Sequence, residues 1–447
     1  MTRQRDLLWL ALVIVGAAPL PAAHANGRAP VTNGVYFRPA DNQTIYVRST
    51  FGLLVSHDAG CTFRWTCEQN VGYGGTFDPK YAIAADGTIF ATTFNGLRVS
   101  RDGGCSFTTA TAALPAGTPG RFAEMWVDAL DIGPTGEVWA ATAENGKPND
   151  IFRSTDGGAT FAPRGGLAPD IWWKSLRVAP SSASRVYATG YQVATPSPLA
   201  HVYTTDDGGA SWTPASLTGV QLAASPLVRI AAVAPADPQL VYLVSSGTSG
   251  TDGDRLYRST DAGATFKEVL ATTQPIGDVI ARDATTVLVA SGEGTYRSAD
   301  GGMTFGAATT SPRLGCLGQR PDGGLIGCAA NWDPDFMAVG RSDDAERWQK
   351  IFRFIELAGP VECPAGTAGH DVCEVDLWPG LRAQFGATGP TCGAQPDGAP
   401  EPQPGGGCCD AGAASPLGMG LVTLLTAGLL RGRRARRDPD PDSRRAA

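Results

Sequence analysis

Residues Ser154-Thr155-Asp156-Gly157-Gly158-Ala159-Thr160-Phe161 form an eight-residue motif that recurs along most of the chain. The motif reads Ser/Thr, any residue, Asp, a small residue, Gly, any residue, Ser/Thr, aromatic residue. Further copies begin at Ser56, Ser100, Thr205, Ser259 and Ser298, and a degenerate seventh copy runs from Ser342 to Trp348. A short turn motif that returns at intervals of a few tens of residues indicates a repeat fold.

The intervals between the copies match the length of a propeller blade. The motif aspartates are Asp58, Asp102, Asp156, Asp207, Asp261, Asp300 and Asp344, at intervals of 44, 54, 51, 54, 39 and 44 residues. Four short strands with their turns occupy about this length in a β-propeller. We therefore predict an all-β fold, a single seven-bladed β-propeller with four-stranded blades.

The segments between the motifs predict the strands of each blade. Short apolar strands precede the first six motifs, at Thr44–Arg48, Thr88–Thr92, Glu137–Ala141, Arg185–Thr189, Gln239–Val244 and Thr286–Ala290. Most have an upstream strand that ends in a Pro turn, at Pro39, Pro134, Pro180, Pro235 or Pro321. One repeat therefore reads strand A, Pro or polar turn, strand B, loop, strand C, motif turn, and strand D from the aromatic residue.

Each residue type in the motif suits a turn. The Asp side chain can accept hydrogen bonds from the backbone N–H groups that follow it, and Ser/Thr do so more weakly. Gly at the fifth position permits a positive φ, and the aromatic residue anchors strand D against the sheet. We therefore expect the motif aspartates to be structural.

The motif resembles the Asp box, or BNR repeat, of sialidases, sortilins, xyloglucanases and photosystem II assembly propellers. The resemblance covers residues from about 33 to 357. In that family the box lies between strands C and D, at the outer edge of a blade, on the face opposite the usual active site. The resemblance therefore implies a seven-bladed propeller with its ligand site on the opposite face, which we call the upper face.

The upper face is built from the B–C and D–A connections, and function in propellers usually resides on such loops. Exposed aromatic residues beside carboxylates and amides could stack on sugars or hold a peptide. The candidate ligand-binding residues are Tyr73, Trp126, Trp172, Trp173, Tyr191, Asp252, Asp254, Trp332, Asp333 and Asp335. Trp126 and Trp172 could instead begin strand A and pack between blades. Asp252 and Asp254 could also hold calcium, although their segment lacks the ligand count of an EF-hand loop.

No catalytic residue set is evident in the sequence. Tyr36-Phe37-Arg38-Pro39 is similar to the Phe-Arg-Ile-Pro signature of sialidases, but the Ile is missing and Pro39 aligns with the ordinary A–B turns. A glycoside hydrolase needs two carboxylates across a cleft. Its candidates are Asp150, Asp252, Asp254, Asp333 and Asp335, and the sequence does not place any two at the required distance. We expect no cofactor, and no metal centre, because the Cys and His residues lack metal-site spacing.

The two ends of the chain predict export. Met1–Ala25 has Arg3 and Arg5, an apolar run and an Ala-x-Ala site, which together are typical of a secretory signal peptide. Near the other end, Pro390–Gly407 reads as an unfolded spacer. Cys408-Cys409, the apolar stretch Leu417–Leu430 and an Arg cluster follow it.

That C-terminal arrangement resembles the MYXO-CTERM sorting tail of Gram-negative bacteria. The resemblance implies processing by surface-sorting machinery and retention at the cell surface or outer membrane, or release from it. The alternative is an ordinary C-terminal membrane anchor, although the apolar stretch is shorter than the roughly 20 residues that a spanning helix needs.

The ten cysteines fit an oxidising compartment. Cys316 and Cys328 bracket an A–B hairpin, and Cys363 and Cys373 bracket a short loop, so both pairs are predicted as local disulfides. Cys61 and Cys67 lie too far apart on an extended strand to bond without a bend. A Cys67–Cys105 bond and a link to Cys392 both remain open.

We therefore predict a signal peptide (1–25), a propeller (26–357), a Cys/Pro/Gly-rich cap and spacer (358–410) and a sorting or membrane tail (411–447). The formal net charge of −7 and the lack of a basic stripe outside the tail do not favour nucleic acid as a partner. We expect a non-catalytic binding or scaffold module for a protein, peptide or glycan. The alternative is a divergent secreted glycoside hydrolase.

Overall fold

The structure is a computed structural model that describes residues 28–391, except 112–121, 194–197, 224–226 and 248–252. The chain divides into two units, Met1–Asp397 and Gly398–Ala447, and the second lies wholly outside the described residues. The predicted signal peptide, Cys392, Cys408, Cys409 and the predicted apolar stretch of the tail also lie outside them.

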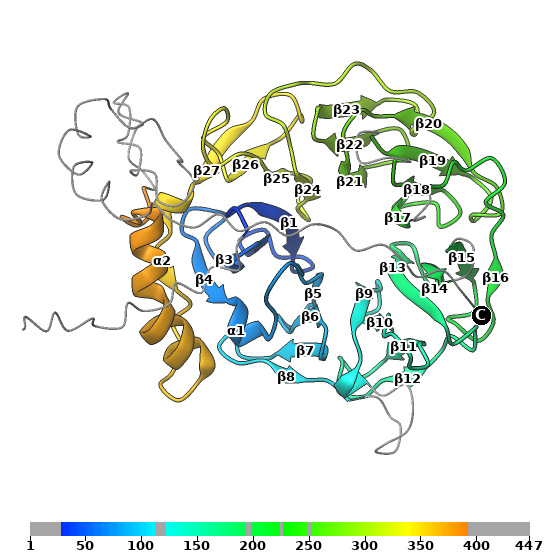
Figure 1. The fold of residues 1–447 in the computed structure, drawn as a ribbon. Helices are drawn as coiled ribbons and strands as arrows, with labels where there is room; N and C mark the ends of the chain where they lie inside the picture. Colours follow the sequence, from blue (N-terminus) through cyan, green and yellow to red (C-terminus); the bar gives the residue numbers. More distant parts are fainter. Residues whose placement is uncertain (1–27, 112–121, 194–197, 224–226, 248–252, 392–447) are drawn as a thin grey trace, which may run out of the picture. The chain divides into compact units, whose positions relative to one another are not determined.

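The described residues form seven sheets that follow one another around a ring, the blades of a β-propeller (Figure 1). Blade 1 contains β1 (Thr32–Phe37), β2 (Ile45–Ser49), β3 (Gly52–Ser56) and β4 (Arg64–Cys67). Blade 2 contains β5 (Tyr81–Ile83), β6 (Ile89–Thr93), β7 (Gly96–Ser100) and β8 (Thr108–Thr109). Blade 3 contains β9 (Val127–Ile132), β10 (Val138–Thr142), β11 (Ile151–Ser154) and β12 (Ala162–Pro163).

The remaining blades repeat this order. Blade 4 contains β13 (Ile171–Ala179), β14 (Ser182–Gln192), β15 (Leu199–Thr205) and β16 (Thr213–Pro214). Blade 5 contains β17 (Val228–Val233), β18 (Val241–Ser245), β19 (Arg255–Ser259) and β20 (Lys267–Ala271), and blade 6 contains β21 (Ile276–Ala281), β22 (Val287–Ser291) and β23 (Gly294–Ser298). Blade 7 contains β24 (Cys316–Gln319), β25 (Leu325–Cys328), β26 (Val339–Ser342) and β27 (Gln349–Phe352).

The predicted seven-bladed propeller is confirmed. In blade 6 a single bridge between Thr295 and Thr309 takes the place of the fourth strand. The predicted B strands exist, and most are displaced by one residue: β2 begins at Ile45 rather than Thr44, for example. The A–B turns that contain the five prolines are also where the sequence places them.

The hydrophobic core lies between neighbouring blades rather than inside any one of them. Phe90 of blade 2, for example, packs in one buried cluster with Phe122 and with Phe152 of blade 3. The motif aromatic residue contributes to this packing, since Phe63 and Phe161 are at most 1% exposed. Each blade is therefore stabilised by the two beside it.

The motif turns have the geometry that their residue types suggest. In the copy at Ser154, the Ser154 hydroxyl donates to Asp156 Oδ1 (2.6 Å) and Gly158 N donates to Ser154 Oγ (2.9 Å). Thr160 N also donates to Asp156 Oδ1 (2.9 Å), and these hydrogen bonds, led by that of Ser154, lower the pKa of Asp156. The other motif aspartates likewise accept backbone N–H groups. The carboxylates of the motif aspartates are thus occupied by hydrogen bonds within their own turns.

The small residue at the fourth motif position also has a structural reason. Gly157 and Gly158 both have positive φ, 68° and 79°, and Ala59 has a φ of 59° at the fourth position of another copy. Two consecutive left-handed residues bring the chain back toward the Ser hydroxyl. A small or Gly residue is favoured because larger side chains strain this conformation.

β-Bulges interrupt the innermost strand of five blades near the start of the strand. The register skips Asn33, Asp128, Lys174, Ala231 and Gly277. A bulge leaves one residue unpaired and re-aims its side chain. Three of these residues, Asn33, Asp128 and Lys174, direct polar side chains toward the neighbouring blade.

Polar side chains join every pair of adjacent blades around the hub, the region enclosed by the innermost strands β1, β5, β9, β13, β17, β21 and β24. In blade order from the 1–2 interface to the 7–1 interface, the pairs are Asn33–Asp78, Lys80–Asp128, Asp131–Val178, Ser175–Ile230, Arg229–Ile276, Asp278–Leu317 and Thr32–Ala338. Several of them satisfy backbone groups that no further strand can pair, since the innermost strand has a free edge.

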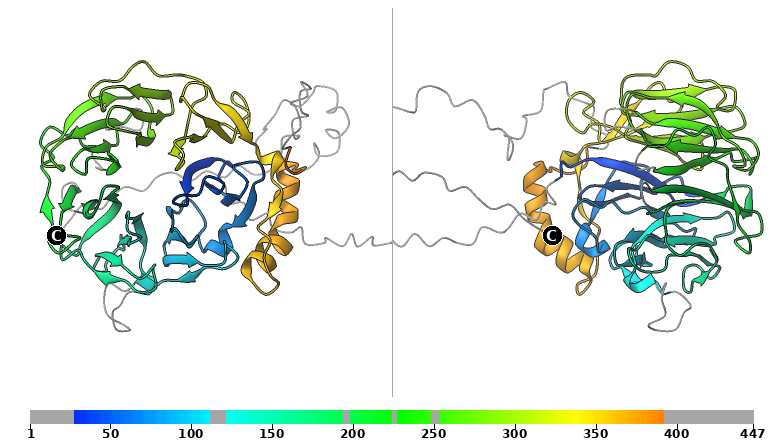
Figure 2. Two further views of the ribbon diagram at one scale, coloured as in Figure 1. Left: turned by 180° about the vertical axis from the view of Figure 1, so that it is seen from behind. Right: turned by 45° about the vertical axis from the view of Figure 1, so that its right-hand side comes forward.

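The ring is closed by the segment that follows blade 7. Strand β28 (Gly359–Pro360) adds to the outer edge of blade 1, parallel to β4, with Gly359 opposite Arg64. The π-helical segment η3 (Gly369–Leu377) and helix α2 (Trp378–Phe385) then lie outside the ring beside β4 (Figure 2). Phe385 packs with Phe51 and Phe354 in the cluster shared by blades 1 and 7.

Two disulfides attach this segment to the propeller. Cys373 bonds to Cys67 at the end of β4, and Cys363 bonds to Cys105 in the motif turn of blade 2. The predicted Cys363–Cys373 bond is therefore wrong, as is the Cys67–Cys105 alternative, because the segment lies along the outer edges of blades 1 and 2 and presents each cysteine to the ring. The predicted Cys316–Cys328 bond is present, and Cys61 is also disulfide-bonded.

The helices of the described residues are short. Besides η3 and α2 they are α1 (Glu68–Val71), η1 (Phe122–Glu124) and η2 (Phe354–Glu356). Within the described ranges, no helix has both the length and the apolar character needed to cross a membrane.

We predict that removing the two long-range disulfides loosens the C-terminal segment. A variant with Cys67, Cys105, Cys363 and Cys373 all replaced by Ser should lose about 3–5 kcal/mol of stability, because these bonds close chain loops of 306 and 258 residues. Limited proteolysis should then cleave η3 and α2 first. The matched control is Cys316→Ser with Cys328→Ser, which should leave the segment protected. Equal protection in both variants would contradict the prediction.

A second prediction concerns Asp128, whose side chain is 8% exposed and which pairs with both Lys80 and Lys174. Asp128→Ala should destabilise the protein by about 2–4 kcal/mol in chemical denaturation, because it leaves two ammonium groups of the hub without their shared carboxylate. Asp206→Ala is the control: Asp206 is 74% exposed and pairs with Arg185 at 3.6 Å, so its loss should cost no more than about 0.5 kcal/mol. Similar losses in the two variants would show that the hub pair contributes no more than a surface pair.

Candidate functional site

The motif turns join the third and fourth strands of each blade, so they define one face of the propeller. The B–C and D–A connections form the opposite, upper face, and the candidate site lies on that face.

Five aromatic side chains form a contiguous strip across the upper face of blades 2 to 4. The members of this aromatic strip are Phe94, Phe77, Trp126, Trp172 and Tyr191. The ring centroids of Phe77 and Phe94 are 4.6 Å apart, those of Phe94 and Trp126 5.1 Å, those of Trp126 and Trp172 6.1 Å, and those of Trp172 and Tyr191 5.6 Å. Edge-on and tilted contacts at these distances are favourable, so the strip is a packed feature and not a set of separate side chains.

Lys174 places a positive charge beside the aromatic strip. Its Nζ lies 4.0 Å from the ring centroid of Trp126 and 5.6 Å from that of Tyr191, within the range of cation–π attraction. The same ammonium group pairs with Asp128 at 2.5 Å. The bulge in β13 that releases Lys174 from the strand register therefore connects the hub to the strip.

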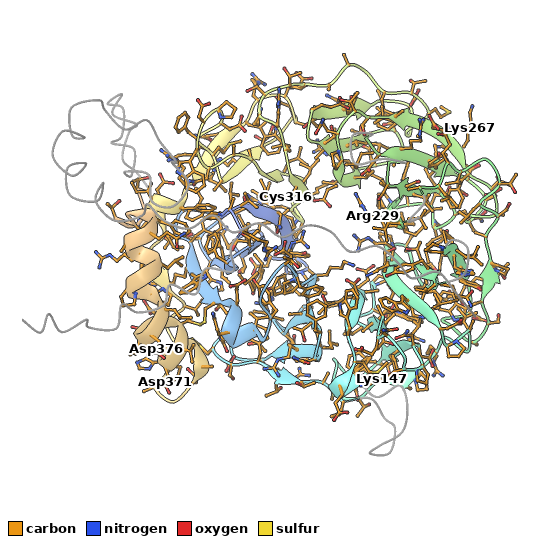
Figure 3. The ribbon with its side chains drawn as sticks, in the orientation of Figure 1. Lys147, Arg229, Lys267, Cys316, Asp371 and Asp376 are labelled. Atoms are coloured by element: carbon orange, nitrogen blue, oxygen red, sulfur yellow. A yellow bond between two sulfur atoms is a disulfide. The ribbon has the colours of Figure 1, made fainter. Side chains whose placement is uncertain are left out.

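A pocket of about 350 Å³ adjoins the strip at Trp172. It is lined by the β10–β11 loop, Glu144 to Asn149, together with Pro169, Asp170 and Val193. Figure 3 labels Lys147 on this loop. The lining combines an aromatic ring with amide, ammonium and carboxylate groups, which is a composition that suits a polar ligand.

The two carboxylates of the pocket are engaged by the protein itself. Glu144 accepts hydrogen bonds from Trp126 N (2.8 Å) and Asn145 N (3.1 Å), so it fixes the start of β9. Asp170 accepts one from the Gln192 side chain. These contacts give both residues a structural reason to be acidic.

Three of the predicted aromatic residues meet in the strip, and two do not belong to the surface. Trp126, Trp172 and Tyr191 are half-buried and in contact, whereas Tyr73 is 8% and Trp173 1% exposed. Tyr73 donates to Ser49 O (3.4 Å), and burial raises its pKa well above the ordinary value. Tyr73 and Trp173 therefore belong to the core rather than to a ligand site. Trp173 faces inward because it alternates with Trp172 along β13, whereas Tyr73 follows helix α1 and packs in a buried cluster with Val71 and Tyr81.

The predicted residues of blade 7 lie apart from the strip. Trp332 packs edge-on against Phe354, with centroids 5.6 Å apart, while Asp335 accepts a hydrogen bond from Ala330 N (3.2 Å). Asp333 is exposed in the same β25–β26 loop. These residues belong to a separate part of the fold.

The acidic candidates of blades 3 and 5 that the structure describes accept hydrogen bonds from backbone N–H groups. Asp254 is 9% exposed and accepts Gly247 N (3.2 Å) and Ile276 N (2.9 Å), which joins blade 5 to blade 6. Asp150 accepts Ile151 N and Gly165 N, and burial raises its pKa. Asp252 lies outside the described residues. Among the residues that the structure describes, no cluster of His, Cys, Asp and Glu could hold a metal ion.

Phe94 is not among the predicted ligand-binding residues, although it is the most exposed ring of the strip at 46%. It occupies the turn between β6 and β7, directly before Asn95-Gly96. Tight turns that contain Asn-Gly usually carry small or polar residues at the surface, so a phenylalanine in such a turn is unusual. This unusual residue is the sequence signal that could have identified Phe94 as a ligand-binding candidate.

Comparisons with known proteins find similarity among solved structures alone. No protein-family model matches the chain, and no curated protein matches it. Among solved structures it is similar to a GH74 enzyme from Niastella koreensis, at 15% identity and a TM-score of 0.42 over 71% of this chain and 65% of that one. It is also similar to the extracellular domain of a putative one-component system from B. thetaiotaomicron, at 13% identity and a TM-score of 0.49 over 71% and 41%.

A third similar structure is YCF48 bound to D1 peptide, at 18% identity and a TM-score of 0.34 over 51% of this chain and 68% of that one. The chain spans less than two thirds of the length of the first three similar structures.

Proposed function

We propose that this protein is an exported, non-catalytic propeller that binds a protein, peptide or glycan through the aromatic strip and the adjoining pocket. The observation that carries the proposal is the contiguity of the strip. Rings from three blades meet on the one face where propeller loops are free to vary, and Phe94 is 46% exposed there. Flat apolar rings with a few polar groups around them suit sugar faces and peptide side chains alike.

The acidic residues support binding over hydrolysis. A hydrolase needs one carboxyl group to deliver a proton and a second to act as base or nucleophile. Glu144, Asp150 and Asp254 instead use their oxygens to hold backbone N–H groups. Of these carboxylates, Glu144 holds the backbone of Trp126 in the aromatic strip, whereas Asp254 joins blades 5 and 6.

Export is supported by the disulfides. Three bonds are formed within the described residues, and structural disulfides are typical of oxidising compartments. We further propose that the chain belongs to the Asp-box superfamily, that residues 1–25 are a signal peptide and that the C-terminal tail is a sorting signal.

The tail proposal predicts a change of location. Deleting Leu417–Ala447 should release the protein into the medium, because the apolar stretch and the Arg cluster are then lost. Immunoblots of cell and medium fractions measure the outcome. Retention of the deletion variant on the cells would contradict a sorting or anchoring role.

The binding proposal predicts that the aromatic strip is needed for ligand binding. Glycan and peptide arrays should first identify a ligand for residues 26–391. Trp172→Ala and Phe94→Ala should each weaken it by about tenfold or more in isothermal titration calorimetry, because an aromatic contact at the centre of a site contributes above 1 kcal/mol.

Phe336→Ala is the matched control for this test. Phe336 is also an exposed phenylalanine, 40% exposed in the β25–β26 loop, and it lies outside the strip. Its replacement should leave the affinity unchanged. Unchanged affinity in the two strip variants, or hydrolysis of an array glycan by the parent protein, would refute the proposal.

A further inference from the structure

The aromatic strip offers side chains to a ligand rather than a strand edge. Tyr191 lies on β14, which is paired on both sides, by β13 and by β15. Trp126 also has both backbone groups engaged, since its N–H donates to Glu144 (2.8 Å) and its carbonyl accepts from Ala143 N (2.8 Å). At these residues a ligand therefore finds no free backbone groups of the kind that an added β-strand would need.

Four rings of the aromatic strip lie in a row of limited length. Successive ring centroids from Phe94 through Trp126 and Trp172 to Tyr191 are 5.1, 6.1 and 5.6 Å apart, so the row spans at most about 17 Å. A polyproline II helix rises about 3.1 Å per residue and completes a turn in about 9 Å. About five residues of such a helix match the length of the row.

The pocket beside Trp172 has largely apolar walls. Pro148 and Pro169 line it together with the Trp172 ring, and Val193, which is 66% exposed, adjoins them. Grooves lined by aromatic side chains are the surfaces on which proline-rich segments dock. The pocket therefore continues the row of rings with walls of the same character.

The hydrogen-bond acceptors of the pocket are largely used within the protein. Both carboxylate oxygens of Glu144 accept backbone N–H groups. The Asn149 amide oxygen accepts Glu144 N (2.7 Å), and its amide nitrogen donates to Glu144 O (3.0 Å). Asp170 at the rim accepts from the Gln192 side chain. A sugar, whose many hydroxyl groups each need both an acceptor and a donor, is therefore poorly matched to this pocket.

Hydrogen-bond donors of the aromatic strip remain available. Among the described residues, Trp172 Nε1 and the Tyr191 hydroxyl have no hydrogen-bond partner, and both side chains are half-buried at the surface. Lys147 adds an exposed ammonium group at the pocket (Figure 3). The backbone of a proline-rich segment presents carbonyl oxygens and few N–H groups, because proline has no N–H. The donors of the protein and the acceptors of such a ligand are thus complementary.

We propose that the ligand of the aromatic strip is a proline-rich peptide segment of a partner protein, in the polyproline II conformation. Its pyrrolidine rings pack on Phe94, Trp172 and Tyr191, and its carbonyl groups accept hydrogen bonds from Trp172 Nε1 and the Tyr191 hydroxyl. The free peptide already has this conformation, so little conformational entropy is lost on binding. This inference rests on the binding function proposed above and adds the chemical class of the ligand.

The experiment titrates the full-length protein with an oligoproline of about ten residues, which at about 3.1 Å per residue is longer than the row of rings. A Gly-Ser peptide of the same length and cellohexaose are titrated separately, all by isothermal titration calorimetry. We expect the oligoproline alone to bind, with a dissociation constant of about 100 μM or tighter. The Gly-Ser peptide has the same backbone carbonyls but neither rings nor a preformed conformation.

Two variants test the rings and the donors of the site. Trp172→Ala should weaken oligoproline binding about tenfold. Tyr191→Phe keeps the ring and removes a hydroxyl that has no partner in the described fold, and it should weaken binding about threefold or more. Tyr203→Phe is the matched control, because Tyr203 lies on the same blade but packs against Trp173 (5.9 Å), outside the strip. It should leave the affinity unchanged.

Failure of the oligoproline to bind, equal affinity for the Gly-Ser peptide, or unchanged affinity in either strip variant would overturn the inference. Binding of cellohexaose that depends on Trp172, without binding of the oligoproline, would leave the binding function in place and assign it to a glycan. Absence of any ligand, both from the arrays and from these titrations, would remove the binding function as well.

Discussion

The free edge of the innermost strand is the constraint on which the rest of this structure depends. Every blade presents to the hub a strand that no further strand can pair, and its backbone groups still need partners. At five of the seven interfaces a polar side chain of one blade bonds a backbone group of the neighbouring innermost strand, such as Asp131 on Val178 N and Asp278 on Leu317 N. Each of these side chains comes from the adjacent blade. The hydrogen bonds that satisfy the backbone of the innermost strands therefore also hold the blades in order around the ring.

Closure of the ring places a different demand on the chain. All four strands of blade 1 come from the start of the propeller, so blades 1 and 7 meet without sharing a strand. The closing contact is instead made on the outside, where β28 extends blade 1 and the disulfides of Cys67 and Cys105 hold the segment that follows blade 7. These two disulfides limit the opening of the ring at its one discontinuous interface. They also stabilise the folded protein, because a cross-link reduces the entropy of the unfolded chain.

Local chemistry in the sequence predicts most of the fold and little of the site. The Asp and Gly of the motif form their turn from adjacent residues, so a single copy carries its own geometry and the intervals count the blades. Phe94 and Trp126 meet only because blades 2 and 3 are neighbours in space, and Cys363 bonds Cys105 across 258 residues. Such pairings depend on the angle and distance between blades, which no local pattern encodes. The same holds for Tyr73 and Trp173, whose aromatic character suits a core as well as a surface.

The β-bulge at Lys174 shows how structure and function are joined in this propeller. Had β13 kept regular register, Lys174 would project from the sheet with its neighbours. The bulge frees it to pair with Asp128 in the hub and to lie 4.0 Å from the Trp126 ring on the upper face. One residue thus takes part both in the interaction that orders the blades and in the surface proposed to bind ligand. A change that disturbed the hub at this position would therefore be felt at the aromatic strip, whereas the motif turns, on the opposite face, are free to serve stability alone.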